Sequence, residues 1–142
     1  MTDEDQRRQW EEALIADMRE HDGRPSDGPL AGHPLMLMYS RGAKSGERRR
    51  AILTYSRDGD DYVVAGTAGG APTEPSWVGN VRANPDVTIE IGKSTIPATA
   101  SVVDEAERQR LWDRHAAALP WFADYPAKAG RTIPVIRLSA RI

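Results

Sequence analysis

The stretch YSRGAKSGERRRAILTYSRDGDDYVVAGTAGG, residues 39–70, carries the clearest fold signal in the chain. Two strand-like runs, near residues 49–57 and 61–67, flank the turn pair Asp58-Gly59. An Asp-Gly pair between two such runs is typical of a tight β-hairpin. The stretch therefore predicts two neighbouring antiparallel strands joined by a short turn.

The rest of the chain adds short strands with helices between them. Residues 4–20 predict an amphipathic helix. Its apolar stripe consists of Trp10, Leu14, Ile15 and Met18. The other expected elements are strands at 34–40, 86–92, 94–103 and within 131–142, helices at 75–84 and after Asp104, and an aromatic loop at 119–130. Six or seven strands without a repeated strand–helix–strand rhythm predict a mostly β (α+β) fold, a largely antiparallel barrel or sandwich with peripheral helices.

Length and composition indicate one globular domain. The chain has 142 residues, a net charge of −2 and no cysteine, which excludes disulfides and thiol chemistry. We expect residues 1–33 to form the N-terminal helix and a Gly/Pro-rich linker, and residues 34–142 to form a single barrel domain. The acidic N-terminus does not resemble a signal peptide, and no apolar run is long enough for a membrane span, so we expect a cytoplasmic protein.

The three histidines do not indicate a metal site. His21, His33 and His115 are scattered, without the spacing of a metal-binding motif and without a cysteine beside them. We therefore expect no metal. His115 falls on the inner face of the helix that follows Asp104, where a packed histidine is the simpler interpretation.

A cluster of cations in residues 41–50 indicates an anionic ligand. Five of these ten residues are basic and one is acidic. The turn Lys44-Ser45, bracketed by Gly42 and Gly46, offers backbone N–H groups, an ammonium and a hydroxyl to a phosphate or carboxylate. Side-chain alternation along a strand places Arg48 and Arg50 on one face and Arg49 on the other. A solvated, charge-rich strand edge is the alternative.

Nucleic acid is a poor match for this cluster. The sequence pI is about 5.9, and the rest of the chain lacks the broad basic face of a duplex-binding protein. We therefore expect no nucleic-acid partner.

A run of small residues follows the second strand of the hairpin. Thr67, Ala68, Gly69 and Gly70 have little side-chain bulk, so a flat ligand could lie against their backbone. An ordinary flexible loop is the alternative.

The order of these features resembles the deazaflavin-dependent nitroreductase family, split β-barrel flavin/deazaflavin oxidoreductases that use coenzyme F420. The motifs are a G-x-K-[ST]-G turn, a basic strand, RDGD-x-Y-V-V, the small-residue loop, P-x-W-x-x-N-x-x-A-N-P and a late R-T-I-P-V. The resemblance covers roughly residues 34–138, and PSWVGNVRANP (75–85) is its most specific part.

The resemblance implies a role for each matching residue. The residues that would hold the phosphate and oligoglutamate tail are Lys44, Ser45 and Arg49, with Arg48 and Arg50 as helpers. Those along the tricyclic ring would be Ile52, Thr54, Thr67, Ala68 and Gly69, and those on the nearby helix Trp77 and Asn80. For Trp77, the core is an equal alternative, since Trp77 and Val81 are one helical turn apart.

The same resemblance implies an F420H2-dependent reductase that transfers a hydride to small electron-poor acceptors such as conjugated enones and lactones, quinones or nitroaromatics. The aromatic loop and the N-terminal helix would wall the substrate, with contacts from Trp121, Phe122 and Tyr125. Relatives tend to have a basic residue where this chain has Ala68, and a phenol where it has Phe122. We expect no obligate catalytic acid or base among the side chains.

Two alternatives to this function stay open at the level of sequence. One is an FMN-dependent oxidoreductase on the same barrel, although five cations exceed what a single phosphate needs. The other is a non-catalytic protein that binds a deazaflavin or another anionic ligand. A homodimer is equally open.

Overall fold

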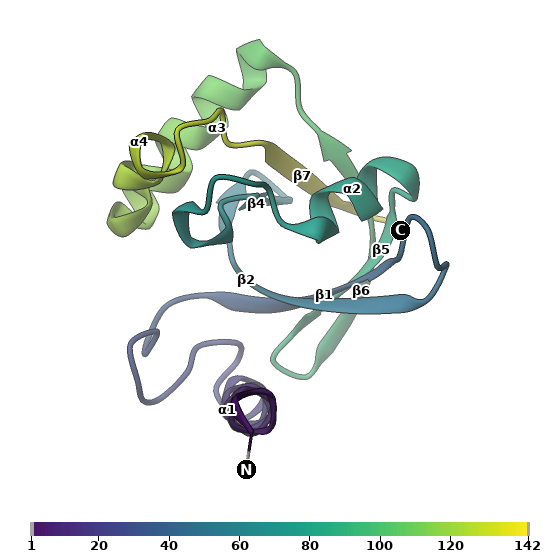
Figure 1. Ribbon diagram of the computed structural model, residues 1–142, viewed down its shortest axis with the longest axis vertical. Helices are drawn as coiled ribbons and strands as arrows, with labels where there is room; N and C mark the ends of the chain where they lie inside the picture. Colours follow the sequence, from purple (N-terminus) through teal and green to yellow (C-terminus); the bar gives the residue numbers. More distant parts are fainter. Residues whose placement is uncertain (1, 142) are drawn as a thin grey trace.

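One antiparallel sheet of seven strands curls into a barrel that is open along one side (Figure 1). The computed structural model describes residues 2–141. The strands follow the order β2-β1-β5-β6-β7-β4-β3 across the sheet. They are β1 (Leu35–Arg41), β2 (Arg48–Thr54), β3 (Ser56–Asp58), β4 (Asp61–Ala65), β5 (Asp86–Ile91), β6 (Ser94–Val102) and β7 (Val135–Ala140). The expected α+β split barrel is confirmed.

The expected strand 49–57 is wrong in one respect, because it is two strands. β2 ends at Thr54 and β3 begins at Ser56, and the two lie at opposite edges of the sheet. β2 pairs only with β1, whereas β3 forms the predicted hairpin with β4. The chain passes from one edge to the other at Tyr55, whose N–H donates to the carbonyl of Pro34 at 3.3 Å. This crossing curls the sheet and leaves one edge of β2 without a neighbouring strand.

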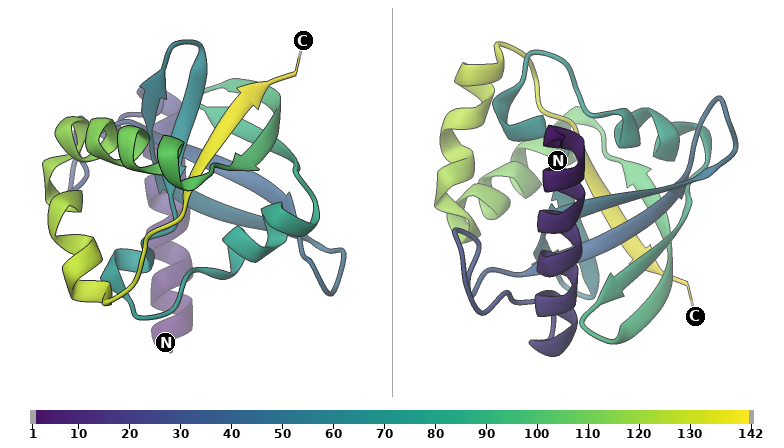
Figure 2. Two further views of the ribbon diagram at one scale, coloured as in Figure 1. Left: turned by 90° about the horizontal axis from the view of Figure 1, so that it is seen from above. Right: turned by 60° about the horizontal axis from the view of Figure 1, so that its bottom comes forward.

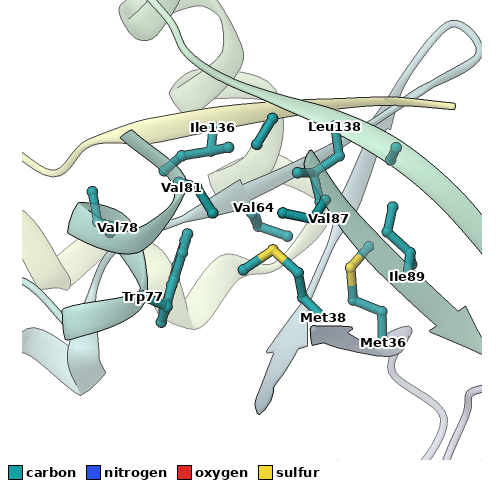
Figure 3. Close-up of a cluster of buried hydrophobic side chains, with 12 residues drawn as sticks. Met36, Met38, Val64, Trp77, Val78, Val81, Val87, Ile89, Ile136 and Leu138 are labelled. Atoms are coloured by element: carbon teal, nitrogen blue, oxygen red, sulfur yellow. The ribbon is translucent and has the colours of Figure 1, made fainter. Parts of the chain in front are cut away.

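Alternation along β1 divides the apolar residues between two cores. Met36 and Met38 point into the barrel, where they meet β4, β5, β7 and the helix α2 (Ser76–Ala83), as Figure 3 shows. Leu35 and Leu37 point outward and are covered by α1 (Asp3–Glu20). In Figures 1 and 2, α1 lies outside the sheet, against β1 and β2.

The apolar stripe of α1 is only partly buried. Ile15 and Met18 are buried against β1, but Trp10 is 55% exposed. Trp10 therefore belongs to the predicted apolar stripe but not to the core. Trp10 precedes Ile15 by five residues and faces a hollow that residues of β2 also line.

The segment 119–130, expected as a loop, is helical. It forms a 3-10 turn (Pro120–Asp124) followed by α4 (Tyr125–Ala129). Each begins with a proline in its first turn, where a missing N–H costs nothing, and Gly130 ends α4 at φ 65°. Together with α3 (Glu105–Ala118), these turns form an aromatic cluster on β4 and β7.

Candidate functional site

The turn between β1 and β2 is fixed by its own backbone. The N–H of Gly42 donates to the carbonyl of Glu47 at 2.7 Å, and the N–H of Gly46 donates to that of Gly42 at 2.9 Å. Gly46 has a φ of 71°, and a Cβ on Gly42 would lie 2.6 Å from the hydroxyl of Ser45. Both glycines are therefore needed for this turn, which leaves Lys44 and Ser45 exposed at its tip.

Asn80 of α2 braces the turn from the side. Its Oδ1 accepts a hydrogen bond of 2.9 Å from the N–H of Ala43. Asn80 was predicted as a cofactor residue. The structure places it beside the groove and gives its Oδ1 a partner within the protein, so Asn80 fixes the position of the turn; a direct contact with the ligand stays a prediction.

The cations of the β1–β2 turn and of β2 differ in how far protein carboxylates neutralise them. In the described part of the chain, Lys44 and Arg48 have no carboxylate within 4.0 Å, and Arg48 lies 3.8 Å over the ring of Tyr39. Arg49 lies 3.4 Å from Glu47, in a solvated pair. Uncompensated positive charge is therefore concentrated at the turn and the start of β2.

Arg50 has two acidic partners on α1. Its guanidinium lies 3.2 Å from Glu12 and 3.8 Å from Glu11. The paired registers Tyr39↔Arg50, Ser40↔Arg49 and Arg41↔Arg48 confirm that Arg48 and Arg50 share a face and that Arg49 takes the other.

A groove of about 1000 Å³ lies along these cations, and we call it the cationic groove. Its predicted site residues are Lys44, Ser45, Arg48, Arg49, Arg50, Trp77 and Asn80. Trp77 is 8% exposed and belongs to the barrel core, and its remaining surface lines the groove. Its contact with a ligand stays a prediction.

Two smaller hollows, of about 470 and 250 Å³, continue the groove along β2, and we call them the apolar end. Ala51 lines all three hollows, so they lie next to one another along β2. The predicted ring residues at the apolar end are Ile52, Thr54, Thr67, Ala68 and Gly69, and the predicted substrate residues are Trp121, Phe122 and Tyr125. The structure thus brings every predicted site residue to one groove along the free edge of β2.

Three residues of α1 at the apolar end were not predicted individually. Trp10, Glu11 and Leu14 line the larger of its two hollows. Their contact with β2 depends on how α1 docks, and no local motif encodes that. Glu11 also lines the cationic groove, so it stands where the two parts meet.

A buried histidine supports the aromatic wall from behind. His115 is fully buried, and its Nδ1 lies 2.7 Å from the hydroxyl of Ser56. Burial lowers the pKa of His115 to about 4, so the ring is neutral at pH 7. It packs edge-on against Phe122 at 4.7 Å between ring centroids. His115 therefore shapes the wall without reaching the groove. Among the residues that the structure describes, no group of histidines and acids could hold a metal.

The groove fits a long ligand that is anionic at one end and flat at the other. The cationic groove supplies an ammonium and guanidiniums without full acid partners, which suit phosphate and carboxylate oxygens. The apolar end is lined by the aromatic rings of Trp121, Phe122 and Tyr125 and by the backbone of residues 67–69, which have little side-chain bulk. A deazaflavin nucleotide with an oligoglutamate tail has this distribution of charge, so the residues fit coenzyme F420.

Comparison with known proteins gives concordant matches. Residues 10–139 match the family described as F420H(2)-dependent quinone reductase. An F420H(2)-dependent quinone reductase of Mycobacterium tuberculosis (strain H37Rv) is 36% identical over 114 residues, which covers 76% of this chain and 74% of that protein.

Two solved structures are similar over most of the chain. One, an F420-H2 dependent reductase (FDR-A), has 36% identity and a TM-score of 0.68, and covers 75% of this chain and 94% of the other. The second, described as a domain-swapped dimer, has 31% identity and a TM-score of 0.70, and covers 97% and 100%. Within residues 2–141, no helix has the length and apolarity needed to cross a bilayer.

Proposed function

Because the chain belongs to the F420H2-dependent quinone reductase family, we propose that it transfers a hydride from reduced coenzyme F420 to a small electron-poor acceptor, with quinones as the acceptor class. Membership of this family confirms the sequence predictions of an F420-dependent oxidoreductase and of F420 as cofactor. It does not favour FMN or a non-catalytic binding protein.

The observation that carries the proposal is that the cationic groove and the apolar end lie side by side along β2. Lys44, Arg48 and Arg49 stand at one end with little or no acid to neutralise them. Aromatic side chains stand at the other end. We assign the phosphate and tail to the cationic groove and the ring to the apolar end.

When bound, F420 supplies a low-potential hydride, and the residues of the chain position it and exclude water. Ile52 and Thr54 on β2 and Thr67 and Gly69 on the facing loop form the two walls of the ring position. Because β2 is an edge strand, its backbone is also free to hydrogen-bond along that edge.

The acceptor would lie against the aromatic wall. The Phe122 ring packs against Trp121 in a tilted arrangement, with centroids 5.5 Å apart, and edge-to-face against Tyr125, with centroids 5.1 Å apart, so the wall is built of packed aromatic rings. Trp10 faces the same hollow from α1. A flat, weakly polar molecule such as a quinone suits these surfaces. The chain has no cysteine, and no histidine of residues 2–141 lines the groove, so the proton that follows the hydride would come from water.

The proposal is tested by mixing the protein with F420H2 and one acceptor at a time: a quinone, a conjugated enone or a nitroaromatic. Return of the oxidised chromophore's visible absorbance measures turnover. We expect quinones to give the highest kcat/KM. Tight F420 binding without turnover of any acceptor would contradict the proposal and favour the non-catalytic alternative.

A homodimer is a separate part of the proposal. Its support is the similar structure described as a domain-swapped dimer, which matches 97% of this chain. Light scattering after size-exclusion chromatography measures the mass directly. A single species of about 15.7 kDa at all concentrations would contradict a dimer.

A further inference from the structure

Arg131, in the segment between α4 and β7, binds an unusual number of backbone carbonyls. Its Nε donates to the carbonyl of Ala71 at 3.1 Å. Its Nη2 lies 3.1 Å from the carbonyl oxygen of Gly66, 3.2 Å from that of Thr67 and 3.3 Å from that of Thr73. One half-buried guanidinium therefore gathers four carbonyls of residues 66–73, which we call the clamped loop.

The clamped loop has a backbone that needs such support. Ala68, Gly69 and Gly70 have φ values of 47°, 65° and 87°, three left-handed residues in succession. An alanine disfavours this region, and a run of three is held locally by two hydrogen bonds, from Gly70 N–H to Thr67 and from Ala71 N–H to Ala68. Lys128 adds a bond of 3.1 Å to the carbonyl of Gly69 from the exposed side.

The direction of these carbonyls fixes the direction of the opposite N–H groups. A trans peptide is planar, and its N–H points away from its C=O. Because the carbonyl of Thr67 turns to Arg131, the N–H of Ala68 turns away from Arg131. In the part of the chain that the structure describes, the N–H groups of Ala68 and Gly69 have no acceptor. Both residues line the apolar end.

We propose that Arg131 is a positioning residue that holds the clamped loop in the one conformation that receives the ring of the cofactor. Arg131 lines none of the three hollows and acts only through the loop. This inference rests on the proposed function, because the loop is a wall of the assigned ring position. It separates ring binding, which depends on Arg131, from tail binding, which depends on Lys44 and Arg49.

The test compares wild-type protein, Arg131→Met and Arg131→Lys, with Arg108→Met as the control. Arg108 bonds to Glu105 within α3 and lines none of the three hollows. Two ligands are titrated by fluorescence: complete F420, and the deazaflavin chromophore without its phosphate and tail. Amide hydrogen exchange of residues 66–73 is measured without ligand, and thermal unfolding monitors the fold.

We expect Arg131→Met to weaken both ligands by the same factor, about tenfold or more, since the lost contacts concern the ring alone. Exchange in the clamped loop should quicken while β5 and β6 keep their protection. Arg131→Lys keeps the charge but can form fewer hydrogen bonds, so its affinities and its exchange rates should lie between those of wild type and Arg131→Met. Arg108→Met should match wild type in binding and in exchange.

Three results would overturn the proposal. The first is a folded Arg131→Met that binds the tail-less chromophore like wild type. The second is unchanged exchange in residues 66–73. The third is an effect on complete F420 alone, because it would place Arg131 with the tail. If wild-type protein binds neither ligand, the proposed function itself fails, whereas a failure confined to the variants removes only the role of Arg131.

Discussion

Two arginine-rich regions of this molecule differ in how far carboxylates of the protein neutralise their positive charge. On the face formed by β3, β7 and α3, Asp58 accepts from Arg110 at 3.0 Å and from Arg137 at 3.0 Å. Arg137 also bonds to Asp61 at 2.9 Å. We call this cluster the paired network. In the cationic groove, Lys44 and Arg48 have no carboxylate within 4.0 Å in the described chain.

The number of arginines in a region therefore does not identify a ligand site. In the paired network, hydrogen bonds from Arg110 and Arg137 lower the pKa of Asp58 to about 2. The charges of these two arginines are therefore already neutralised within the protein. The cations of the groove keep their charge for an external anion. Cations that line a hollow and lack a carboxylate partner, which we call unmet cations, therefore indicate an anion-binding site better than the number of cations does.

The largest effect on F420 affinity should come from removing cations of the cationic groove. We expect Lys44→Ala and Arg49→Ala each to weaken F420 binding about tenfold, because each removes a charge-assisted contact to the tail or phosphate. Dissociation constants from fluorescence titration measure this, and thermal unfolding should stay within a degree or two of wild type, as for most exposed substitutions. Arg110→Ala, which removes a paired arginine, should leave affinity unchanged. Equal losses in all three variants would erase the distinction.

The next effect concerns stability and lies in the paired network. Asp58→Asn should lower the free energy of unfolding by about 1–2 kcal/mol at pH 7, after allowance for solvent screening of a partly exposed group, and should leave F420 affinity intact. Denaturant titration measures the loss. A variant as stable as wild type would show that the network contributes nothing.

The pH dependence of that contribution has a definite sign. The folded pKa of Asp58 is about 2, below the ordinary value of 3.8. The unfolded chain therefore binds the proton first, and the stabilisation is complete above about pH 4 and is lost as the pH falls toward 2. Wild type and Asp58→Asn should converge in stability over that range, and a constant difference would contradict the assignment.

The smallest effect should come from the acids of α1 beside Arg50. Replacing Glu11 and Glu12 together by glutamine should free Arg50 and remove two negative charges near the groove. We expect F420 binding to tighten by about two- to fivefold at low salt, as for exposed ion pairs, with the difference fading at high salt. Weaker binding would indicate that these acids help to place Arg50 for the ligand.

Features with local causes could be predicted from the sequence. Three features each depend on residues within a few positions: the glycines of the turn, the alternation of Arg48, Arg49 and Arg50, and the start of α3 after Asp104, whose side chain accepts from the N–H of Glu107. The cationic end of the site could be predicted from these features, because all its cations lie within residues 41–50.

Features that depend on distant contacts could not be predicted. The break at Tyr55 depends on a bond to Pro34, and the role of Arg131 on carbonyls about sixty residues earlier. The place of Glu11 in the groove depends on the docking of α1. In each case nothing in the neighbouring sequence marks the residue, because its partner is brought to it only by the fold.

The most direct test of the central claim, that unmet cations hold the polyanionic end of F420, is a titration of the protein with F420 and with FMN at low and high salt. The account predicts F420 binding that weakens steadily as salt screens the groove, with much weaker binding of FMN, whose single phosphate meets fewer cations. Equally tight FMN binding, or F420 affinity that does not change with salt, would contradict it.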